Sequence, residues 1–243
     1  MKKTILTKGI FATGFAIALF ILLAGFTKLT SPDDVIKKLK HGNERFVQND
    51  RTYPNQDKER IDLTSEKGQY PYATVIACSD SRVPVEHLFD AGIGDIFVIR
   101  VAGNVIDIDE AGSIEYGVDH LHTPVLVVLG HSGCGAVTAV CRGDEVHGNI
   151  PKLVDNIVPA VNKAKHEHGE EFNPELLSAA VKNNVWQSIE DLISISPVSV
   201  KLIKNGKLKV VGAIYHLDSG KVEWLGEHPH QKDLLALEKT HSH

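Results

Sequence analysis

Residues 73–82, with the sequence ATVIACSDSR, decide the fold, because an apolar run ends there abruptly in a polar segment. The run 73–77 is short, rich in β-branched side chains and apolar at successive positions, which is typical of a strand buried on both faces. The polar residues 78–82 follow without a break and form a loop at its carboxyl end. The segment therefore predicts a buried strand that presents polar side chains at one edge of a sheet.

The same pattern occurs twice more along the chain. Residues 96–100 (IFVIR) lead into Ala102-Gly103-Asn104, and residues 125–129 (VLVVL) lead into the loop GHSGCG at 130–135. Helical stretches are expected next to these strands, at residues 110–121 and 135–141. Strands that alternate with helices indicate a parallel sheet. Ligands of such sheets bind at the carboxyl ends of the strands, where all three polar loops are expected.

The flanking segments complete an α/β fold. A helix is predicted to begin near residue 32, because Ser31 and Pro32 supply a cap and a first-turn proline. The remaining expectations are a turn-rich stretch at 51–70, helices at 151–167 and 174–195, and a hairpin of strands 208–213 and 221–225. The predicted architecture is a central parallel sheet flanked by helices, with an N-terminal helical arm and a C-terminal hairpin that extends the sheet.

Composition excludes several classes of protein. The chain has 243 residues, of which 42% are hydrophobic and 23% charged, so it is neither disordered nor collagen-like. Three cysteines cannot form a disulfide scaffold in a chain of this length. The net charge is −5 and no long basic run occurs, so nucleic acid is not an expected partner.

Residues 1–30 are expected to lie outside the folded domain, which takes up residues 31–243. Lysines precede an apolar run from Ile10 to Phe26, which is typical of a signal peptide or an uncleaved membrane anchor. The chain is therefore expected to be exported, and its composition favours a bacterial periplasm as the destination. Membrane contact is expected only through this N-terminal segment, if it is not cleaved. No cysteine follows the run, which disfavours a lipid anchor.

Three residues with metal-binding side chains fall at the ends of two predicted strands. Cys78 follows the first strand, and His131 and Cys134 follow the strand at 125–129. Two thiolates and one imidazole suit zinc in type and number, and three ligands leave the fourth tetrahedral position open, as in catalytic zinc sites. Either cysteine alone is more simply interpreted as a small apolar core residue. The three together, in loops rich in glycine, favour a metal site.

These residues resemble the motifs of a known family. Cys78-Ser79-Asp80-Ser81-Arg82 and His131-Ser132-Gly133-Cys134-Gly135 are similar to the two signature motifs of the β-class carbonic anhydrases, in their plant-type branch. The resemblance runs from about residue 32 to 225. It implies zinc-dependent, reversible hydration of carbon dioxide to bicarbonate and a proton, by attack of zinc-bound hydroxide. It also implies Zn²⁺ held by Cys78, His131 and Cys134, and a homodimer or higher homo-oligomer.

The resemblance assigns further roles. Asp80 and Arg82 match the catalytic pair of the family, in which the arginine keeps the aspartate ionised and oriented. The backbone amide of Gly135, at a predicted helix start, is placed to donate to a substrate oxygen. The remaining matches are the substrate-pocket residues Gln69, Phe97 and Tyr116, and a candidate for proton transfer, His120.

One departure and two alternatives remain. Another branch of the family has a tryptophan, part of an inhibitory bicarbonate site, where this chain has Val75, so that site is expected to be absent although Arg100 matches its arginine. The alternatives are a carbon disulfide or carbonyl sulfide hydrolase on the same fold, and a non-catalytic envelope protein that binds zinc or bicarbonate. Asp80 and Arg82 argue against a pure binding module.

Overall fold

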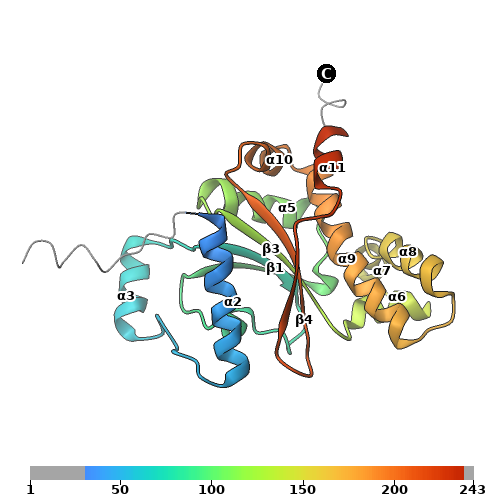
Figure 1. The fold of residues 1–243 in the computed structure, drawn as a ribbon, viewed down its shortest axis with the longest axis horizontal. Coiled ribbons are helices and arrows are strands. Elements are labelled where there is room, and N and C mark those ends of the chain that lie inside the picture. The colour runs from blue at the N-terminus through green and yellow to red at the C-terminus, as the bar shows by residue number, and fades with distance from the viewer. Residues whose placement is uncertain (1–30, 238–243) are drawn as a thin grey trace, which may run out of the picture. The chain divides into compact units, whose positions relative to one another are not determined.

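The computed structural model describes residues 31–237, which form a five-stranded sheet flanked by helices (Figure 1). The strands are β1 (Ala73–Cys78), β2 (Ile96–Val101), β3 (Val125–His131), β4 (Lys209–Tyr215) and β5 (Val222–Gly226). Their order is β2-β1-β3-β4-β5, and every neighbouring pair is parallel except β4 and β5. This confirms the predicted parallel sheet extended by a C-terminal hairpin.

Helices connect the strands, and the first described helix begins at its predicted cap. They are α2 (Pro32–Gln48), α3 (Lys58–Lys67), α4 (Val85–Leu88), α5 (Ile108–Glu115), α6 (Gly135–Arg142), α7 (Ile150–Val154), α8 (Val158–His168), α9 (Pro174–Ile195), α10 (Pro197–Lys204) and α11 (Gln231–Leu237), with a 3₁₀ turn η1 (Ala102–Asn104) and a π turn η2 (Tyr116–His120). The Ser31 hydroxyl accepts from the backbone N–H of Asp34 at the start of α2, as predicted.

Two expected segments were wrong in detail. The stretch 51–70 is not only turns, because it contains α3, whose first turn is capped by the side chain of Asp57. That helix buries no residue, so it has no apolar stripe to reveal it in the sequence. The single helix expected at 151–167 is two helices, α7 and α8. Between them the fully buried Ile157 turns into the core.

The helix α9, the longest among residues 31–237, packs closely against β3 and β4. Figure 1 shows α9 beside β3 and β4, together with α6, α7 and α8. The close approach depends on two glycines, because a Cβ on Gly130 or Gly212 would lie 2.7 or 2.8 Å from the methyl groups of Val185. The helix therefore lies directly behind the end of β3, where the polar loop begins.

Among residues 31–237, no helix is both long and apolar enough to cross a membrane. The signal peptide or anchor predicted at residues 1–30 lies outside the described residues.

Candidate metal centre and active site

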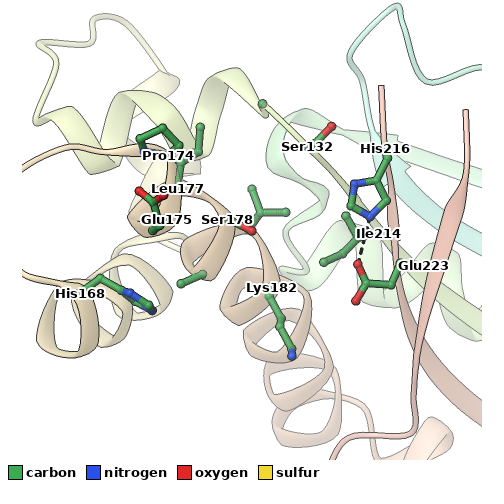
Figure 2. Close-up of a pocket in the computed structure, with 13 residues that line it drawn as sticks. Ser132, His168, Pro174, Glu175, Leu177, Ser178, Lys182, Ile214, His216 and Glu223 are labelled. Carbon is green, nitrogen blue, oxygen red and sulfur yellow. Dashed lines mark hydrogen bonds and ion pairs between the residues drawn. The ribbon is translucent and has the colours of Figure 1, made fainter. Parts of the chain in front are cut away.

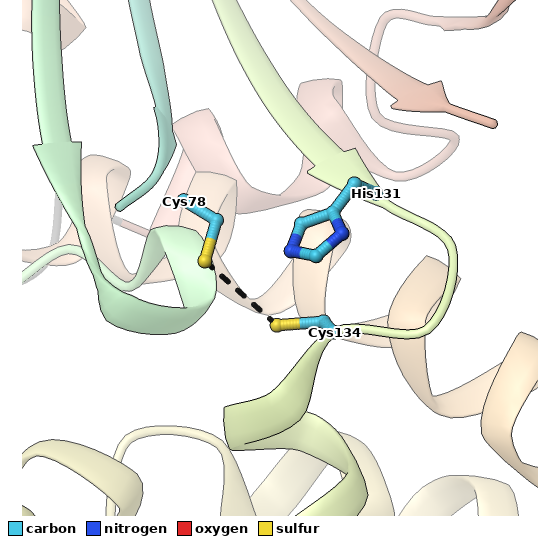
Figure 3. A group of neighbouring side chains, drawn as sticks. All are labelled: Cys78, His131 and Cys134. Atoms are coloured by element: carbon cyan, nitrogen blue, oxygen red, sulfur yellow. Dashed lines mark hydrogen bonds between the residues drawn. The ribbon is translucent and has the colours of Figure 1, made fainter. Parts of the chain in front are cut away.

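The topology brings the two sequence motifs to one place. β1 and β3 are parallel neighbours, so their carboxyl ends, at Cys78 and His131, lie at the same edge of the sheet. Cys134 follows as the N-cap of α6. The Sγ atoms of Cys78 and Cys134 are 4.0 Å apart, and the three candidate ligand atoms all lie within 4.8 Å of one another. Figure 3 shows the three side chains converging, and we call them the Cys/His/Cys cluster.

The loop after β3 orients the imidazole of His131. The backbone N–H of Ser132 donates to Tyr215 O at 2.9 Å, and Gly133 takes the left-handed conformation that allows the tight turn, with φ of 61°. Nδ1 of His131 lies 3.0 Å from Ser132 O, a carbonyl that only accepts, so Nδ1 carries the proton. Nε2 then has a free lone pair facing the two thiols. This atom is buried and has no hydrogen-bond partner among the described residues.

The two thiols have different proton affinities. Cys78 Sγ accepts hydrogen bonds from the backbone N–H groups of Asp80 (3.4 Å) and Gly103 (3.3 Å). The neighbouring Cys134 thiol, together with these donors, lowers the pKa of Cys78 to about 4 in spite of its burial. The same pairing, added to burial, raises the pKa of Cys134. The lower pKa thus belongs to Cys78, the cysteine whose sulfur accepts from the two backbone N–H groups.

The cluster fits a zinc ion. Its donors are two sulfurs and one imidazole nitrogen, all on buried side chains. A buried nitrogen without a hydrogen-bond partner is costly unless something occupies its lone pair, and a metal ion does so. Three protein ligands are the number found in catalytic zinc sites.

Asp80 is held beside the cluster by Arg82. The Arg82 guanidinium donates to both carboxylate oxygens, from Nε to Oδ1 at 2.9 Å and from the terminal NH2 to Oδ2 at 2.7 Å. This pair holds the pKa of Asp80 well below its usual range, so the carboxylate is ionised. Its Oδ2 is 3.8 Å from His131 Nε2, and its side chain is only 16% exposed. The sequence-predicted pair is therefore assembled next to the cluster.

Arg100 makes contacts that sequence reasoning did not predict. Its guanidinium donates to the backbone carbonyls of Cys78 (3.2 Å) and Asp80 (2.6 Å), and thus ties the first motif to the end of β2. The only signal in the sequence was a long cationic side chain at the carboxyl end of a neighbouring strand. Val75, at the position of the tryptophan in the other branch, is fully buried in β1.

The candidate pocket residues lie apart from the cluster within this chain. Phe97 is paired with Thr74 in the sheet register, four residues before Cys78 along β1. The ring centroids of Phe97 and Tyr116 are 5.8 Å apart, and those of Tyr116 and His120 are 4.6 Å apart, so these three side chains form one aromatic row. Gln69 is exposed in the segment that precedes β1, at the opposite end from Cys78. Gly135 does lie at the cluster, as the first residue of α6.

A separate groove lies on the other side of the loop after β3. It has a volume of about 580 Å³ between α9 and the β4–β5 hairpin, and Ser132 and Gly133 form part of its wall (Figure 2). A contact of 3.0 Å between His216 and Glu223 joins the two hairpin strands beside it. None of the three cluster residues lines this groove. The groove and the cluster therefore share only the loop between them.

Comparison with known proteins identifies the family. The carbonic anhydrase family model matches residues 73–222, which include both motifs and the strands β1 to β4, and ends at the first residue of β5. The β-carbonic anhydrase CafA of Aspergillus fumigatus superposes with a TM-score of 0.67 and 27% identity, over 75% of this chain and 89% of that one. The chain belongs to the β-carbonic anhydrase family.

The curated relatives that this chain matches are named carbonic anhydrases. Carbonic anhydrase 2 of Mycobacterium tuberculosis is 38% identical over 200 residues, 79% of this chain and 92% of that protein. The carbonic anhydrase of Mycolicibacterium smegmatis is 38% identical over 202 residues, 80% of this chain and 93% of that protein. The predicted fold, family and enzyme class are thereby confirmed. The sulfur-substrate and binding-module alternatives gain no support from these relatives.

Proposed function

We propose that this β-carbonic anhydrase binds Zn²⁺ through Cys78 Sγ, His131 Nε2 and Cys134 Sγ, and hydrates carbon dioxide reversibly to bicarbonate at that site. The observation that carries the proposal is the buried Nε2 of His131, which has no hydrogen-bond partner among residues 31–237 and faces two sulfurs within 4.8 Å. Zinc bound in such a site lowers the pKa of water toward neutrality and so supplies a nucleophile at physiological pH.

Asp80 acts as the hydrogen-bond acceptor that orients the nucleophile. Its carboxylate is ionised, and Arg82 occupies both of its oxygens, so it remains beside the cluster rather than turning into it as a further ligand. Oδ2, the oxygen nearer to His131, accepts a hydrogen from the attacking water and directs the oxygen lone pair at the carbon of the substrate. The N–H of Gly135, at the first position of α6, donates to a substrate oxygen.

The active form is a homodimer or higher homo-oligomer that completes the substrate pocket. β2 is the edge strand of the described sheet, and an edge strand offers unpaired backbone groups to a second chain. The aromatic row of Phe97, Tyr116 and His120 lies on β2 and η2 rather than at its own cluster. The β-carbonic anhydrases of Sordaria macrospora, with a TM-score of 0.61 and 26% identity over 70% of this chain and 87% of theirs, are described as tetrameric. A second copy therefore supplies Gln69, Phe97 and Tyr116 as walls of the pocket, with His120 nearby for proton transfer.

The enzyme is exported to a bacterial periplasm. Residues 1–30 serve as the signal peptide, or as an anchor if they are not cleaved, and residues 31–243 are the catalytic domain. The support is in the sequence, where lysines precede the apolar run from Ile10 to Phe26.

The test combines zinc content with stopped-flow hydration of carbon dioxide. The purified chain is expected to carry one zinc per protomer, and Asp80→Asn is expected to keep that zinc and lose about 10²- to 10⁴-fold in kcat. Asp62→Asn is the matched control, because Asp62 is exposed on α3 and its only ion pair within residues 31–237 is with Lys58. A folded wild-type chain without zinc, or an Asp80→Asn variant as active as the wild type, would contradict the proposal.

A further inference from the structure

The turn at Gly103 joins the first thiol of the cluster to the helix behind the sheet. The N–H of Gly103 donates to Cys78 Sγ at 3.3 Å. The carbonyl of Gly103 accepts from the side-chain Nδ2 of Asn184 on α9 at 2.7 Å. Asn184 is 1% exposed, so this hydrogen bond is shielded from water. Asn184, 81 residues further along the chain, thus binds the residue whose N–H donates to Cys78 Sγ.

The turn depends on this support because its backbone is unusual. Two of the three residues of η1, Gly103 and Asn104, have positive φ, 71° and 48°, so the turn departs from regular 3₁₀ geometry, and its buried carbonyls need hydrogen-bond donors. Asn184 binds the first of these carbonyls. The hydroxyl of Ser188, one turn further along α9, lies 3.0 Å from the second, on Asn104.

The supporting helix is itself held rigidly. Val185, the neighbour of Asn184, packs against Gly130 and Gly212 at distances that leave no room for a Cβ. The N–H and the carbonyl of Gly103 lie on either side of one Cα with little torsional restraint of its own. Anchoring the carbonyl on a rigid helix removes much of that freedom and holds the turn in the conformation in which the N–H points at Cys78 Sγ.

We propose that Asn184 is a positioning residue of the metal centre, and that it sets the affinity for zinc by aiming the Gly103 N–H at Cys78 Sγ. The inference rests on the proposed zinc site. Hydrogen-bond partners of metal ligands typically contribute 10- to 100-fold in metal affinity or activity. Asn184 acts one bond further out, so the expected effect is at the lower end of that range.

A purely structural role for Asn184 makes a different prediction. A buried amide that only satisfies a carbonyl contributes to the free energy of unfolding and leaves metal affinity unchanged in the folded protein. Zinc affinity must therefore be measured beside stability, with controls that change stability alone.

The experiment uses the full chain and the variants Asn184→Asp and Asn184→Ala. Asn184→Asp keeps the volume and replaces the donor Nδ2 by an acceptor. Asn183→Ala is the matched control on the same helix, since Asn183 donates to Ala160 O at 3.5 Å, away from η1. Leu192→Ala, at a fully buried position of α9, is the control for lost stability. The readouts are zinc affinity by chelator competition and the sulfur-to-cobalt absorption band of the cobalt-substituted protein.

Both Asn184 variants are expected to bind zinc about tenfold more weakly, with a shifted cobalt band, while Asn183→Ala and Leu192→Ala match the wild type. Wild-type affinity in a folded Asn184 variant would overturn the inference, and so would an equal loss in Leu192→Ala. Should neither Asn184 variant fold, Asn184→Leu, which keeps the branched shape of the side chain and removes its hydrogen-bond donor, takes their place, with a weaker zinc complex supporting the inference and an unchanged one overturning it. A wild-type chain that binds no zinc would instead refute the proposed function, and this is measured before any variant.

Discussion

At the scale of single residues, the spacing of Asp80 and Arg82 is sufficient to predict their contact. The side chains are two positions apart in a loop, and the structure joins them by two hydrogen bonds between guanidinium and carboxylate. Sequence reasoning could also place both on the loop after β1, because the apolar run ends at Cys78. It could not find the contacts of Arg100 and Asn184, because these depend on which elements become neighbours after folding.

The bidentate geometry leads to a prediction for Arg82→Lys. Lysine keeps the charge but offers a single ammonium, so it cannot bind both oxygens of Asp80 in one plane. We expect kcat for carbon dioxide hydration to fall about tenfold, which corresponds to about 1.4 kcal/mol, with zinc content unchanged. The measurement is stopped-flow turnover, with Arg142→Lys as the control variant. Arg142 lies at the far end of α6, where it stacks on Phe172. Equal turnover in the two variants would show that charge alone suffices.

Gly103 leads to a prediction about stability. Alanine there would take a positive φ, and its Cβ would lie 2.7 Å from Cδ1 of Ile157. Gly143 has a similar φ of 69°, and no atom of the described residues lies within 4 Å of a Cβ added there. We therefore expect Gly143→Ala to lower the free energy of unfolding by about 1 kcal/mol and Gly103→Ala by about 3 kcal/mol. Urea unfolding of both variants measures the difference. Equal losses of unfolding free energy would mean that the Ile157 side chain moves aside without destabilising the fold.

At the scale of elements, hydrophobic patterning predicted the segments that bury an apolar face. β1 and β3 are buried along their whole length, and α9 spans residues 174–195 as predicted. The helix α3 was missed because it buries nothing, so no periodic signal exists. The break between α7 and α8 was missed because Ile157 fits a helical pattern and turns only to meet the core around Gly103.

The element α2 is tied to the core through Asp90, and this gives a pH dependence. The carboxylate of Asp90 accepts from Arg45 Nε (2.6 Å), from the N–H and hydroxyl of Thr52 (both 2.9 Å) and from the N–H of Tyr53 (3.0 Å). Burial by itself raises the pKa of Asp90, but these donors outweigh it and lower the pKa to about 2.

The sign follows from linkage. A carboxyl whose pKa is lower in the folded state stabilises the fold above its unfolded pKa, near 3.8, and this contribution disappears as the pH falls through 2. We expect wild type to exceed Asp90→Asn in free energy of unfolding above pH 4, with the difference shrinking between pH 4 and pH 2. Urea titrations of both proteins across this range, in a chelator to remove metal effects, measure it. If the difference in unfolding free energy between wild type and Asp90→Asn did not change with pH, the charge of Asp90 would be excluded as the source of that difference.

At the scale of the whole molecule, one chain does not assemble every residue that the family resemblance assigns. The cluster, Asp80 and Gly135 lie at the carboxyl end of the sheet. Phe97 lies on the neighbouring strand, four register positions before the level of Cys78, a distance along the strand on the order of 13 Å at 3.3 Å per residue. Sequence motifs assign a role to a residue without saying which copy of the chain supplies it. The shared pocket proposed above removes this conflict, because β2 carries Phe97 at the open edge of the sheet.

A shared pocket predicts complementation between two defective chains. Cys78→Ser removes a proposed metal ligand and Phe97→Ala removes a proposed wall, so each homo-oligomer is expected to hydrate carbon dioxide poorly. If the wall comes from the partner, a mixed dimer joins the intact cluster of one chain to the intact Phe97 of the other. Equal co-expression then restores about a quarter of wild-type turnover, because half of the dimers are mixed and each has one complete site.

The matched control is the pair Cys78→Ser and His131→Ala, in which both chains lack a proposed metal ligand and no mixed dimer has a complete site. If Phe97 serves the cluster of its own chain, the first pair behaves like this control, because the intact cluster then lacks its wall and the intact wall faces a damaged cluster. The turnover of the purified mixed species, compared with the sum of its separate parents, therefore distinguishes a pocket built by two chains from one built within a single chain.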